Sequence, residues 1–334
     1  ESSGWTNDLI YNNRSFSHNY VWTIKQPPKI IFGQNSVKEY EFLDKYLIIT
    51  SKGAKSRGWL DYSGLTNHII FDNVEPNPSI KTTEKIISKF KDSDFTHIIG
   101  IGGGSSMDVA KFCAFKMNKL KIMIPTTFGS GSEVTRISVL KVDGKKKSFH
   151  DDKIFADVAI VDSYFLDDSS DDIIKNAVID ACAQATEAHD SKLANPYTKL
   201  LCENAFNILE KAILNKTYKK LPLGSLICGL GFGNSSTTLG HALSYVYSNE
   251  GYSHGHALAF TTQVAHKFNK SKFYERFKKI VDELNFSPIK ISTSLDEAAE
   301  LILRDRKHLD NNPYLLSKIE IINLLNEINL FQRN

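Results

Sequence analysis

Three side chains of types that often bind divalent metal ions occur in the second half of the chain, with two polar neighbours at helical spacing. Asp180 and Gln184 are four residues apart, so on a helix they share one face. His241 and Tyr245 have the same spacing, and His254 follows in a stretch flanked by serine and glycine. One carboxylate and two imidazoles suit Zn²⁺ or Fe²⁺ with open coordination positions. The chain has ten histidines, and a lone histidine is more often a surface or core residue, so spacing alone does not establish a metal site.

Two loops in the first half are candidates for a nucleotide site. Residues 100–108 (GIGGGSSMD) join a predicted strand to a predicted helix, whose N-terminus offers unpaired N–H groups to a diphosphate. Residues 124–135 place hydroxyls and glycines directly after another strand, at the sheet edge where open α/β sheets bind ligands. The alternative for the first loop is a tight turn without a ligand. The usual GxGxxG fingerprint on a first strand is absent.

The elements that position these residues divide the chain in two. Short apolar runs alternate with helical stretches in the first half, which predicts an α/β domain with a mostly parallel, doubly wound sheet. Few strand patterns remain after residue 162, and the rest predicts an all-helical domain. We place the boundary near residue 165, giving domains 1–165 and 166–334. The predicted strands are 29–32, 46–50, 67–71, 96–101, 120–125 and 158–162, and the predicted helices are 106–118, 170–190, 196–214, 222–248, 255–269, 272–284, 294–308 and 313–329.

Composition narrows the class of protein. The 334 residues carry 41 Lys plus Arg against 38 Asp plus Glu, a net charge of +3, which argues against a nucleic-acid binder. The four cysteines lie in apolar stretches, so we expect no disulfides and a reducing, cytoplasmic location. No apolar run is long enough to span a membrane, and residues 1–20 lack an apolar signal core. The short run Lys145–Lys147 is interpreted as a solvated turn.

Taken together, the motifs resemble the iron-containing, or group III, alcohol dehydrogenase family over about residues 25–315. That family combines an N-terminal dinucleotide-binding domain with an all-helical metal-binding domain, in a dehydroquinate synthase-like architecture. A small aldehyde or alcohol as substrate, NADP(H) or NAD(H), a zinc or iron ion and a homodimer are therefore expected, with no nucleic-acid or membrane partner. The matching stretches are residues 31–33, 75–78, 102–108, 124–135, Asp180-Ala, Glu187-Ala, Gly240-His241 and His254-Gly255.

The resemblance also implies roles for individual residues. The metal ligands would be Asp180, His241 and His254. Asp108 would shape the diphosphate loop. The remaining cofactor contacts would come from Gly102, Gly103, Gly104, Ser105, Thr126, Thr127 and Ser130.

Three positions depart from the family pattern. Iron-binding members have a His where this chain has Gln184, and the related glycerol dehydrogenases lack that His and use a three-ligand zinc site. Zn²⁺ is thus at least as well supported as Fe²⁺, with Gln184 a weak fourth ligand or a sign of metal loss. Tyr245 stands where many members place a His near the nicotinamide. Ser51, followed by Lys52, replaces an Asp common in NAD-preferring members and would accept a 2′-phosphate.

These features favour a metal-dependent NAD(P)(H) alcohol dehydrogenase or aldehyde reductase. Its catalytic residues would be the three ligands, with Tyr245 either a proton donor or, as we prefer, a packing residue. A weaker resemblance in residues 26–33 suggests a phosphonylated or phosphorylated aldehyde such as phosphonoacetaldehyde, with Arg136 and Lys146 or Lys147 as a candidate anion site or solvated surface. The alternatives are a dehydroquinate synthase-like sugar phosphate cyclase, for which residues 170–260 supply few basic side chains, and a metal-free nucleotide-binding relative.

Overall fold

The computed structural model describes residues 21–332, which leaves the expectation for residues 1–20 outside the described part. The chain forms two compact units that divide after Ser170, five residues beyond the predicted boundary. Lys25–Ser170 make up the first unit, and Asp171 begins the helices of the second.

The first unit is built on a six-stranded parallel sheet in the order β1-β8-β5-β4-β2-β3. All four residues of β2 are buried, as expected for a strand covered on both faces. Each strand coincides with a predicted apolar run, within two residues at either end. The strands are β1 (Lys29–Phe32), β2 (Tyr46–Ile49), β3 (Ile69–Phe71), β4 (His97–Gly102), β5 (Leu120–Pro125) and β8 (Val158–Val161).

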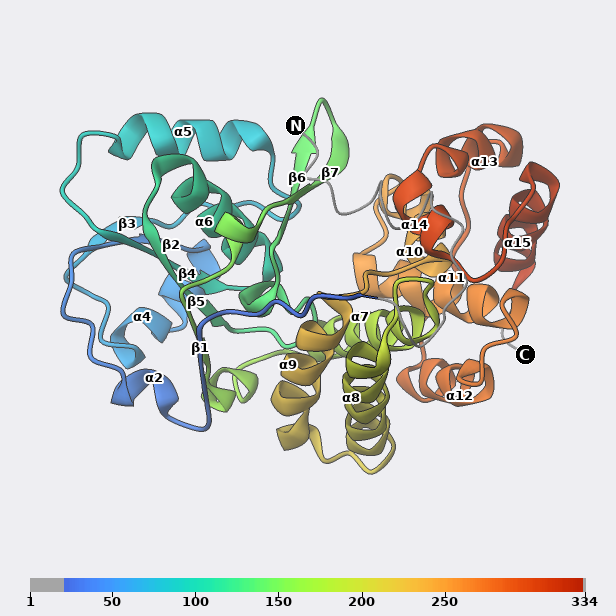
Figure 1. The fold of residues 1–334 in the computed structure, drawn as a ribbon, viewed down its shortest axis with the longest axis horizontal. Helices are drawn as coiled ribbons and strands as arrows, with labels where there is room; N and C mark the ends of the chain where they lie inside the picture. The colour runs from blue at the N-terminus through green and yellow to red at the C-terminus, as the bar shows by residue number, and fades with distance from the viewer. Residues whose placement is uncertain (1–20, 333–334) are drawn as a thin grey trace. The chain divides into compact units, whose positions relative to one another are not determined.

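Helices cover both faces of this sheet. α5 (Ile80–Phe90) and α6 (Gly104–Met117) lie on one side, and α2 (Ser36–Glu39) and α4 (Trp59–Tyr62) lie on the other (Figure 1). Ile86, Phe90, Met107 and Phe112 belong to the apolar core beneath α5 and α6. Because α6 follows β4 directly, its N-terminus lies at the carboxyl edge of the sheet. The shorter helical segments are α3 (Lys52–Ser56), η1 (Ser132–Val134), η2 (Asp152–Ile154) and η3 (Ser163–Leu166).

An antiparallel hairpin was missed by the sequence analysis. β6 (Ile137–Val142) pairs with β7 (Lys145–His150), so the interpretation of Lys145–Lys147 as a solvated turn is wrong. The turn is formed by Asp143 and Gly144, both with positive φ, a pair typical of two-residue hairpin loops. Lysines placed on a strand with one solvated face gave no apolar signal.

In its described residues from Asp171 on, the second unit contains helices and no strands. α11 packs against both α7 and α10, and α7 also packs against α8 and α9. The helices are α7 (Asp171–Asp190), α8 (Pro196–Leu214), η4 (Tyr218–Lys220), α9 (Leu221–Phe232), α10 (Leu239–Ser248), α11 (His254–Phe268), α12 (Tyr274–Leu284), α13 (Leu295–Leu303), α14 (Arg306–Asn311) and α15 (Lys318–Leu330).

Two of the predicted helices are each interrupted. The span 222–248 is α9 and α10, separated by residues 233–238 (GNSSTT), whose hydroxyl and amide side chains favour caps and turns over a helix interior. The span 294–308 is α13 and α14, because Asp305 accepts a hydrogen bond from the His308 N–H and starts a new helix. Both interruptions place a helix start beside the candidate site.

The four cysteines are free and buried, which confirms the expectation of no disulfides. Among residues 21–332, every helix is too short or too polar to cross a bilayer.

Candidate active site

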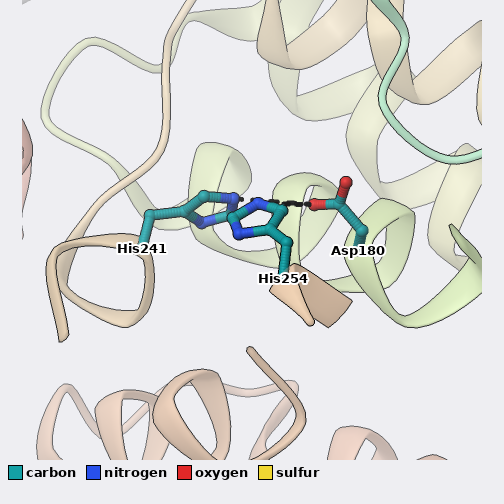
Figure 2. A group of neighbouring side chains, drawn as sticks. All are labelled: Asp180, His241 and His254. Atoms are coloured by element: carbon teal, nitrogen blue, oxygen red, sulfur yellow. Dashed lines mark ion pairs between the residues drawn. The ribbon is translucent and has the colours of Figure 1, made fainter. Parts of the chain in front are cut away.

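Asp180, His241 and His254 converge on one point in the helical unit. They come from the middle of α7, the start of α10 and the first residue of α11. Nε2 of His254 lies 3.4 Å from Oδ1 of Asp180, and Nε2 of His241 lies 3.7 Å from the same oxygen. Figure 2 shows both imidazoles turned toward the carboxylate. One donor atom from each residue lies within 4.8 Å of the others, and the described part of the chain holds no second group of this kind.

A buried carboxylate, Glu187, fixes the orientation of His241. Its Oε2 lies 2.8 Å from Nδ1 of His241, so Nδ1 carries the proton and Nε2 is left to face Asp180. Oε1 of Glu187 accepts hydrogen bonds from the backbone N–H groups of His241 and Thr238, which are otherwise unpaired at the start of α10. Oε2 also accepts from the Thr262 hydroxyl on α11. Glu187 therefore ties α7, α10 and α11 together at the site.

Close helix contacts explain the glycines beside the two histidines. A Cβ on Gly240 would lie 2.7 Å from Oε2 of Glu187, and a Cβ on Gly255 would lie 2.2 Å from the backbone oxygen of Asn176 on α7. The Asn176 side chain also accepts hydrogen bonds from the Ser253 hydroxyl and the His256 N–H, which hold the first turn of α11. α7 and α11 thus approach so closely that no side chain fits at residue 255, and this approach brings Asp180 and His254 together.

The charges in this group stabilise one another. Burial alone would raise the pKa of Asp180, but the nearby His254 and His241 outweigh it and hold that pKa below its usual range. Burial would likewise raise the pKa of Glu187, yet its contacts with His241 lower it. Burial disfavours charge on His241, but Glu187 and Asp180 raise its pKa. Both carboxylates are therefore ionised at neutral pH and available to balance a cation.

Gln184 reaches this group through its amide nitrogen. Its Nε2 donates to Oδ1 of Asp180 at 3.0 Å, and its Oε1 lies 3.8 Å from Sγ of Cys228. An amide N–H₂ group is a donor of hydrogen bonds and has no lone pair for a metal. In this arrangement the Gln184 amide nitrogen contacts the carboxylate and its oxygen lies near Cys228, and its role as a weak fourth metal ligand stays a prediction.

Tyr245 and an unexpected histidine lie next to His241. The rings of His308 and His241 are 6.1 Å apart and nearly parallel, and the rings of His308 and Tyr245 are 5.9 Å apart. Burial, reinforced by the Asp305 charge, raises the pKa of Tyr245, so its hydroxyl keeps its proton. Sequence reasoning missed His308, which follows His241 by 67 residues and whose one local signal is Asp305 three residues before it.

Two other histidines near the ligands in sequence make contacts outside the three-residue group. His256 Nε2 lies 2.6 Å from the Ser287 carbonyl oxygen, and His266 Nε2 lies 2.7 Å from the Thr186 hydroxyl.

The two candidate nucleotide loops lie side by side in the first unit. Gly102 ends β4, Gly103 precedes α6, and Gly104 and Ser105 are the first residues of that helix, so their N–H groups are free of helical partners. Thr126 follows β5, and its N–H donates to the Gly102 carbonyl at 2.9 Å.

The hydroxyls of the second loop come close to the glycines of the first. A Cβ on Gly103 would lie 3.2 Å from the Thr127 hydroxyl oxygen, and a Cβ on Gly104 would lie 2.9 Å from that of Ser130. The structure therefore brings N–H groups and hydroxyls together at one edge of the sheet, where an anion can be bound.

Beneath these loops lie Asp108, which was expected to shape the diphosphate loop, and Lys111, which the sequence analysis did not mention. Asp108 accepts from the Ser132 hydroxyl at 2.6 Å and from the Val139 N–H at 3.1 Å, so both of its oxygens face protein groups. The Lys111 ammonium donates to the carbonyls of Ser132 and Ile137, and burial lowers its pKa to about 8. Asp108 and Lys111 thus fasten the second loop and the hairpin to α6.

Ser51 is the residue before α3, at the carboxyl end of β2. It therefore lies at the same sheet edge as the two loops, because neighbouring parallel strands end together.

Comparison with known proteins assigns the chain to a family. A model described as iron-containing alcohol dehydrogenase matches residues 27–163, and a model described as the C-terminal part of that family matches residues 175–329. The chain belongs to the iron-containing alcohol dehydrogenase family. A solved iron-containing alcohol dehydrogenase with 25% identity superposes with a TM-score of 0.85, covering 92% of this chain and 99% of that one. The architecture is the dehydroquinate synthase-like one.

Two relatives illustrate the range of the family. Long-chain-alcohol dehydrogenase 1 of Geobacillus thermodenitrificans is 34% identical over 56% of this chain, and the match spans about half of the relative, 54%. The NADPH-dependent butanol dehydrogenase of Clostridium saccharobutylicum is 27% identical over 77% of this chain and 71% of the relative.

Iron-containing alcohol dehydrogenases use NAD(P) and iron, and the residues present here fit a divalent ion. Two imidazole nitrogens and one ionised carboxylate face one another, and Glu187 holds one imidazole in the tautomer that a metal needs.

Proposed function

We propose that this member of the iron-containing alcohol dehydrogenase family is a metal-dependent NAD(P)(H) alcohol dehydrogenase or aldehyde reductase. The observation that carries the proposal is the convergence of Asp180, His241 and His254 from three helices, with both Nε2 atoms facing one carboxylate oxygen. Three protein ligands leave positions open for a substrate, as in catalytic metal sites.

The residues of the site would have different roles in such a reaction. When bound by Asp180, His241 and His254, a Zn²⁺ or Fe²⁺ ion would supply positive charge that polarises a carbonyl group. Asp180 partly neutralises that charge, and Glu187 keeps Nε2 of His241 available by holding the proton at Nδ1. Gln184 donates to Asp180 and thereby orients it.

Proton transfer is assigned to water or to a cofactor ribose hydroxyl and not to Tyr245. Because burial and Asp305 raise the pKa of the Tyr245 hydroxyl, loss of its proton is unfavourable at neutral pH. Tyr245 packs against His308 and limits the space beside His241.

The first unit is proposed to bind NADP(H) or NAD(H). The N–H groups of Gly104 and Ser105 would bind the diphosphate, and the hydroxyls of Thr127 and Ser130 lie close enough to share in its recognition. Ser51 carries no charge that would repel a 2′-phosphate, and a relative is named as NADPH-dependent, so we propose that NADPH is accepted.

The substrate is proposed to be a small aldehyde or the corresponding alcohol. Phosphonylated and phosphorylated aldehydes remain part of this proposal, but Arg136 is a poor candidate for binding their anionic group. Its Nε lies 2.9 Å from the Asp152 carboxylate, which already balances its charge.

Oxidation of NADPH and NADH in the presence of a panel of aldehydes tests the function, together with metal analysis of the purified protein. We expect the absorbance of NAD(P)H to fall only when an aldehyde is present. One mole of NAD(P)H should be consumed for each mole of alcohol formed. His241→Ala should reduce kcat/KM at least 1,000-fold, because the ion loses one of three ligands, while Glu187 keeps its other donors. No net change in NAD(P)H with any aldehyde would favour a cyclase, and protein that holds no metal after reconstitution would favour a metal-free relative.

A further inference from the structure

Lys111 on α6 is a buried cation that the proposed reaction does not use. It is 0% exposed, and its ammonium lies 2.7 Å from the Ser132 carbonyl oxygen, 2.6 Å from that of Ile137 and 3.2 Å from that of Thr135. An ammonium has three N–H donors and no acceptor, so the three carbonyls match its donors one for one. Lys111 therefore holds three points of residues 132–137, which join the second candidate nucleotide loop to β6.

Ser132 connects this contact to the two candidate nucleotide loops. Its carbonyl accepts from Lys111, its hydroxyl donates to Asp108 at 2.6 Å, and its N–H donates to the Ser130 hydroxyl oxygen at 3.3 Å. The Ser130 hydroxyl is in turn the group that a Cβ on Gly104 would meet at 2.9 Å. Gly104 is the first residue of α6, the helix that also carries Asp108 and Lys111. One helix thus offers its N-terminal N–H groups to a diphosphate and, further along, holds the hydroxyl that faces them.

We propose that Lys111 is a positioning residue for the nicotinamide cofactor, and that tight binding of the cofactor requires the proton on its ammonium. This inference rests on the proposed function, because it takes the two loops as the diphosphate site. A neutral amine has two N–H donors and a lone pair, so one of the three buried carbonyls would lose its donor. Residues 132–137 would then shift, and the Ser130 hydroxyl would move with them.

The charged groups around Lys111 bring the loss of this proton close to neutral pH. Burial lowers the pKa of Lys111 to about 8, against the opposing charges of Asp108 and Glu133. Oδ1 of Asp108 lies 3.8 Å from the ammonium, Glu133 belongs to η1, and Lys146 on β7 acts on Asp108 from the hairpin. Because burial raises the pKa of Glu133 to about 7, this carboxyl ionises below the pH at which Lys111 loses its proton.

Binding of NADH to the metal-loaded protein from pH 7 to pH 9, followed by the fluorescence of the nicotinamide, tests the proposal. We expect the dissociation constant of the wild type to rise about tenfold, because most Lys111 side chains have lost their proton at pH 9. Lys111→Arg keeps its charge at both pH values, so its dissociation constant should not change over this range. Lys111→Met removes the donors and should weaken binding about tenfold already at pH 7.

Lys121→Met is the matched control. Lys121 is also a buried lysine of the first unit, 8% exposed, and burial lowers its pKa. It lies at the amino end of β5, whereas Thr126 follows the carboxyl end of that strand. Lys121→Met should leave the dissociation constant for NADH and its pH dependence unchanged. An equal loss of affinity in Lys111→Met and Lys121→Met would attribute the effect to general destabilisation and overturn the role of Lys111.

Calorimetry of the unmodified protein tests the proton directly. In buffers of different ionisation enthalpy at pH 8, binding of one NADH should be accompanied by uptake of about half a proton, since half of the Lys111 side chains are then neutral. Binding without proton uptake would contradict the proposal.

Hydrogen exchange in the metal-loaded protein without NADH separates this inference from the proposed function. Exchange in residues 126–139, corrected for its intrinsic dependence on pH, reports how firmly Lys111 holds the segment. We expect faster opening at pH 9 than at pH 7 in the wild type and no such change in Lys111→Arg. The same pH dependence of exchange or of NADH binding in both proteins would overturn the role of Lys111. Absence of NADH binding at every pH would instead count against the nucleotide site, with hydrogen exchange still deciding on Lys111.

Discussion

Gln184 separates this chain from family members that carry a fourth ligand. Its amide donates to the same oxygen of Asp180 that both imidazoles face, so it holds the carboxylate in position without adding a lone pair. Hydrogen-bond partners of metal ligands contribute about 10–100-fold to metal affinity.

Two substitutions of Gln184, by His and by Leu, should change the metal affinity in opposite directions. Gln184→His places an imidazole on the same helix face, and we expect metal affinity to rise at least tenfold. Gln184→Leu removes the donor to Asp180 at similar volume and should lower the affinity about tenfold. Zn²⁺ titration of the stripped proteins, followed by calorimetry, provides the measurement. Equal affinities in all three proteins would show that residue 184 does not act on the site.

Ser51 is the residue expected to set the choice of cofactor. Ser51→Asp introduces a carboxylate that can accept from the ribose hydroxyls of NADH but repels a 2′-phosphate. The ratio of kcat/KM for NADPH to that for NADH should fall about tenfold or more. Ser51→Ala, which removes the hydroxyl without adding charge, is the control and should shift the ratio much less. A wild-type protein that strongly prefers NADH would contradict this role of Ser51.

At the scale of secondary-structure elements, the site depends on how closely α11 approaches α7. Gly255→Ala would put a Cβ 2.2 Å from the Asn176 backbone oxygen, so the first turn of α11 must move and carry His254 away from Asp180. We expect metal affinity to fall at least tenfold, as measured by competition with a chelating dye.

Gly224→Ala is the matched control for that experiment. A Cβ there would contact the Leu209 side chain between α9 and α8, at 2.7 Å, which destabilises the same unit without touching the ligands. A similar loss of metal affinity in both variants would mean that general destabilisation, and not the position of His254, explains the result.

The elements that the sequence predicted well are those with a local signal. Buried parallel strands such as β2 appear as continuous apolar runs, and α8 begins at Pro196 after a capping Asn195. The break between α9 and α10 was missed although residues 233–238 (GNSSTT) favour turns over a helix interior. What starts α10 is Glu187, whose carboxylate accepts the Thr238 and His241 N–H groups from more than 50 residues away.

The candidate site shows the same limit. Asp180, His241 and His254 were found through motifs that include them, and the structure brings them together. The positions of Glu187 and His308 depend on contacts between helices that are distant in sequence. Such contacts cannot be predicted from the spacing of residue types along the chain.

For the whole molecule, the buried carboxyl of Glu133 predicts a pH dependence of stability. Burial raises its pKa to about 7 from 4.5, so the folded protein resists its ionisation. A raised carboxyl pKa means that the folded state binds more protons than the unfolded state between these values. The free energy of unfolding should therefore fall as pH rises from about 4.5 to 7, and Glu133 should have no further effect above that.

Glu133→Gln removes this contribution. The free energy of unfolding of this variant, minus that of the wild type, should rise by up to about 3 kcal/mol between pH 4.5 and pH 7.5. This is the size that the shift in the pKa of Glu133 implies. Urea unfolding of both proteins at the two pH values measures the change. A difference in stability that is the same at both pH values would show that folding does not raise the pKa of Glu133.

The position of Glu187 has a consequence for protein engineering. Transplanting the three ligands into another helical scaffold would not by itself reproduce this centre. The His241 imidazole is oriented by the Glu187 carboxylate, which also accepts the His241 N–H at the start of α10. The smallest portable unit is a set of four side chains plus the glycines that admit them, Gly240 and Gly255. A designer who copies the ligands alone would obtain a histidine free to rotate, and with it a centre of weak affinity and poor selectivity among metals.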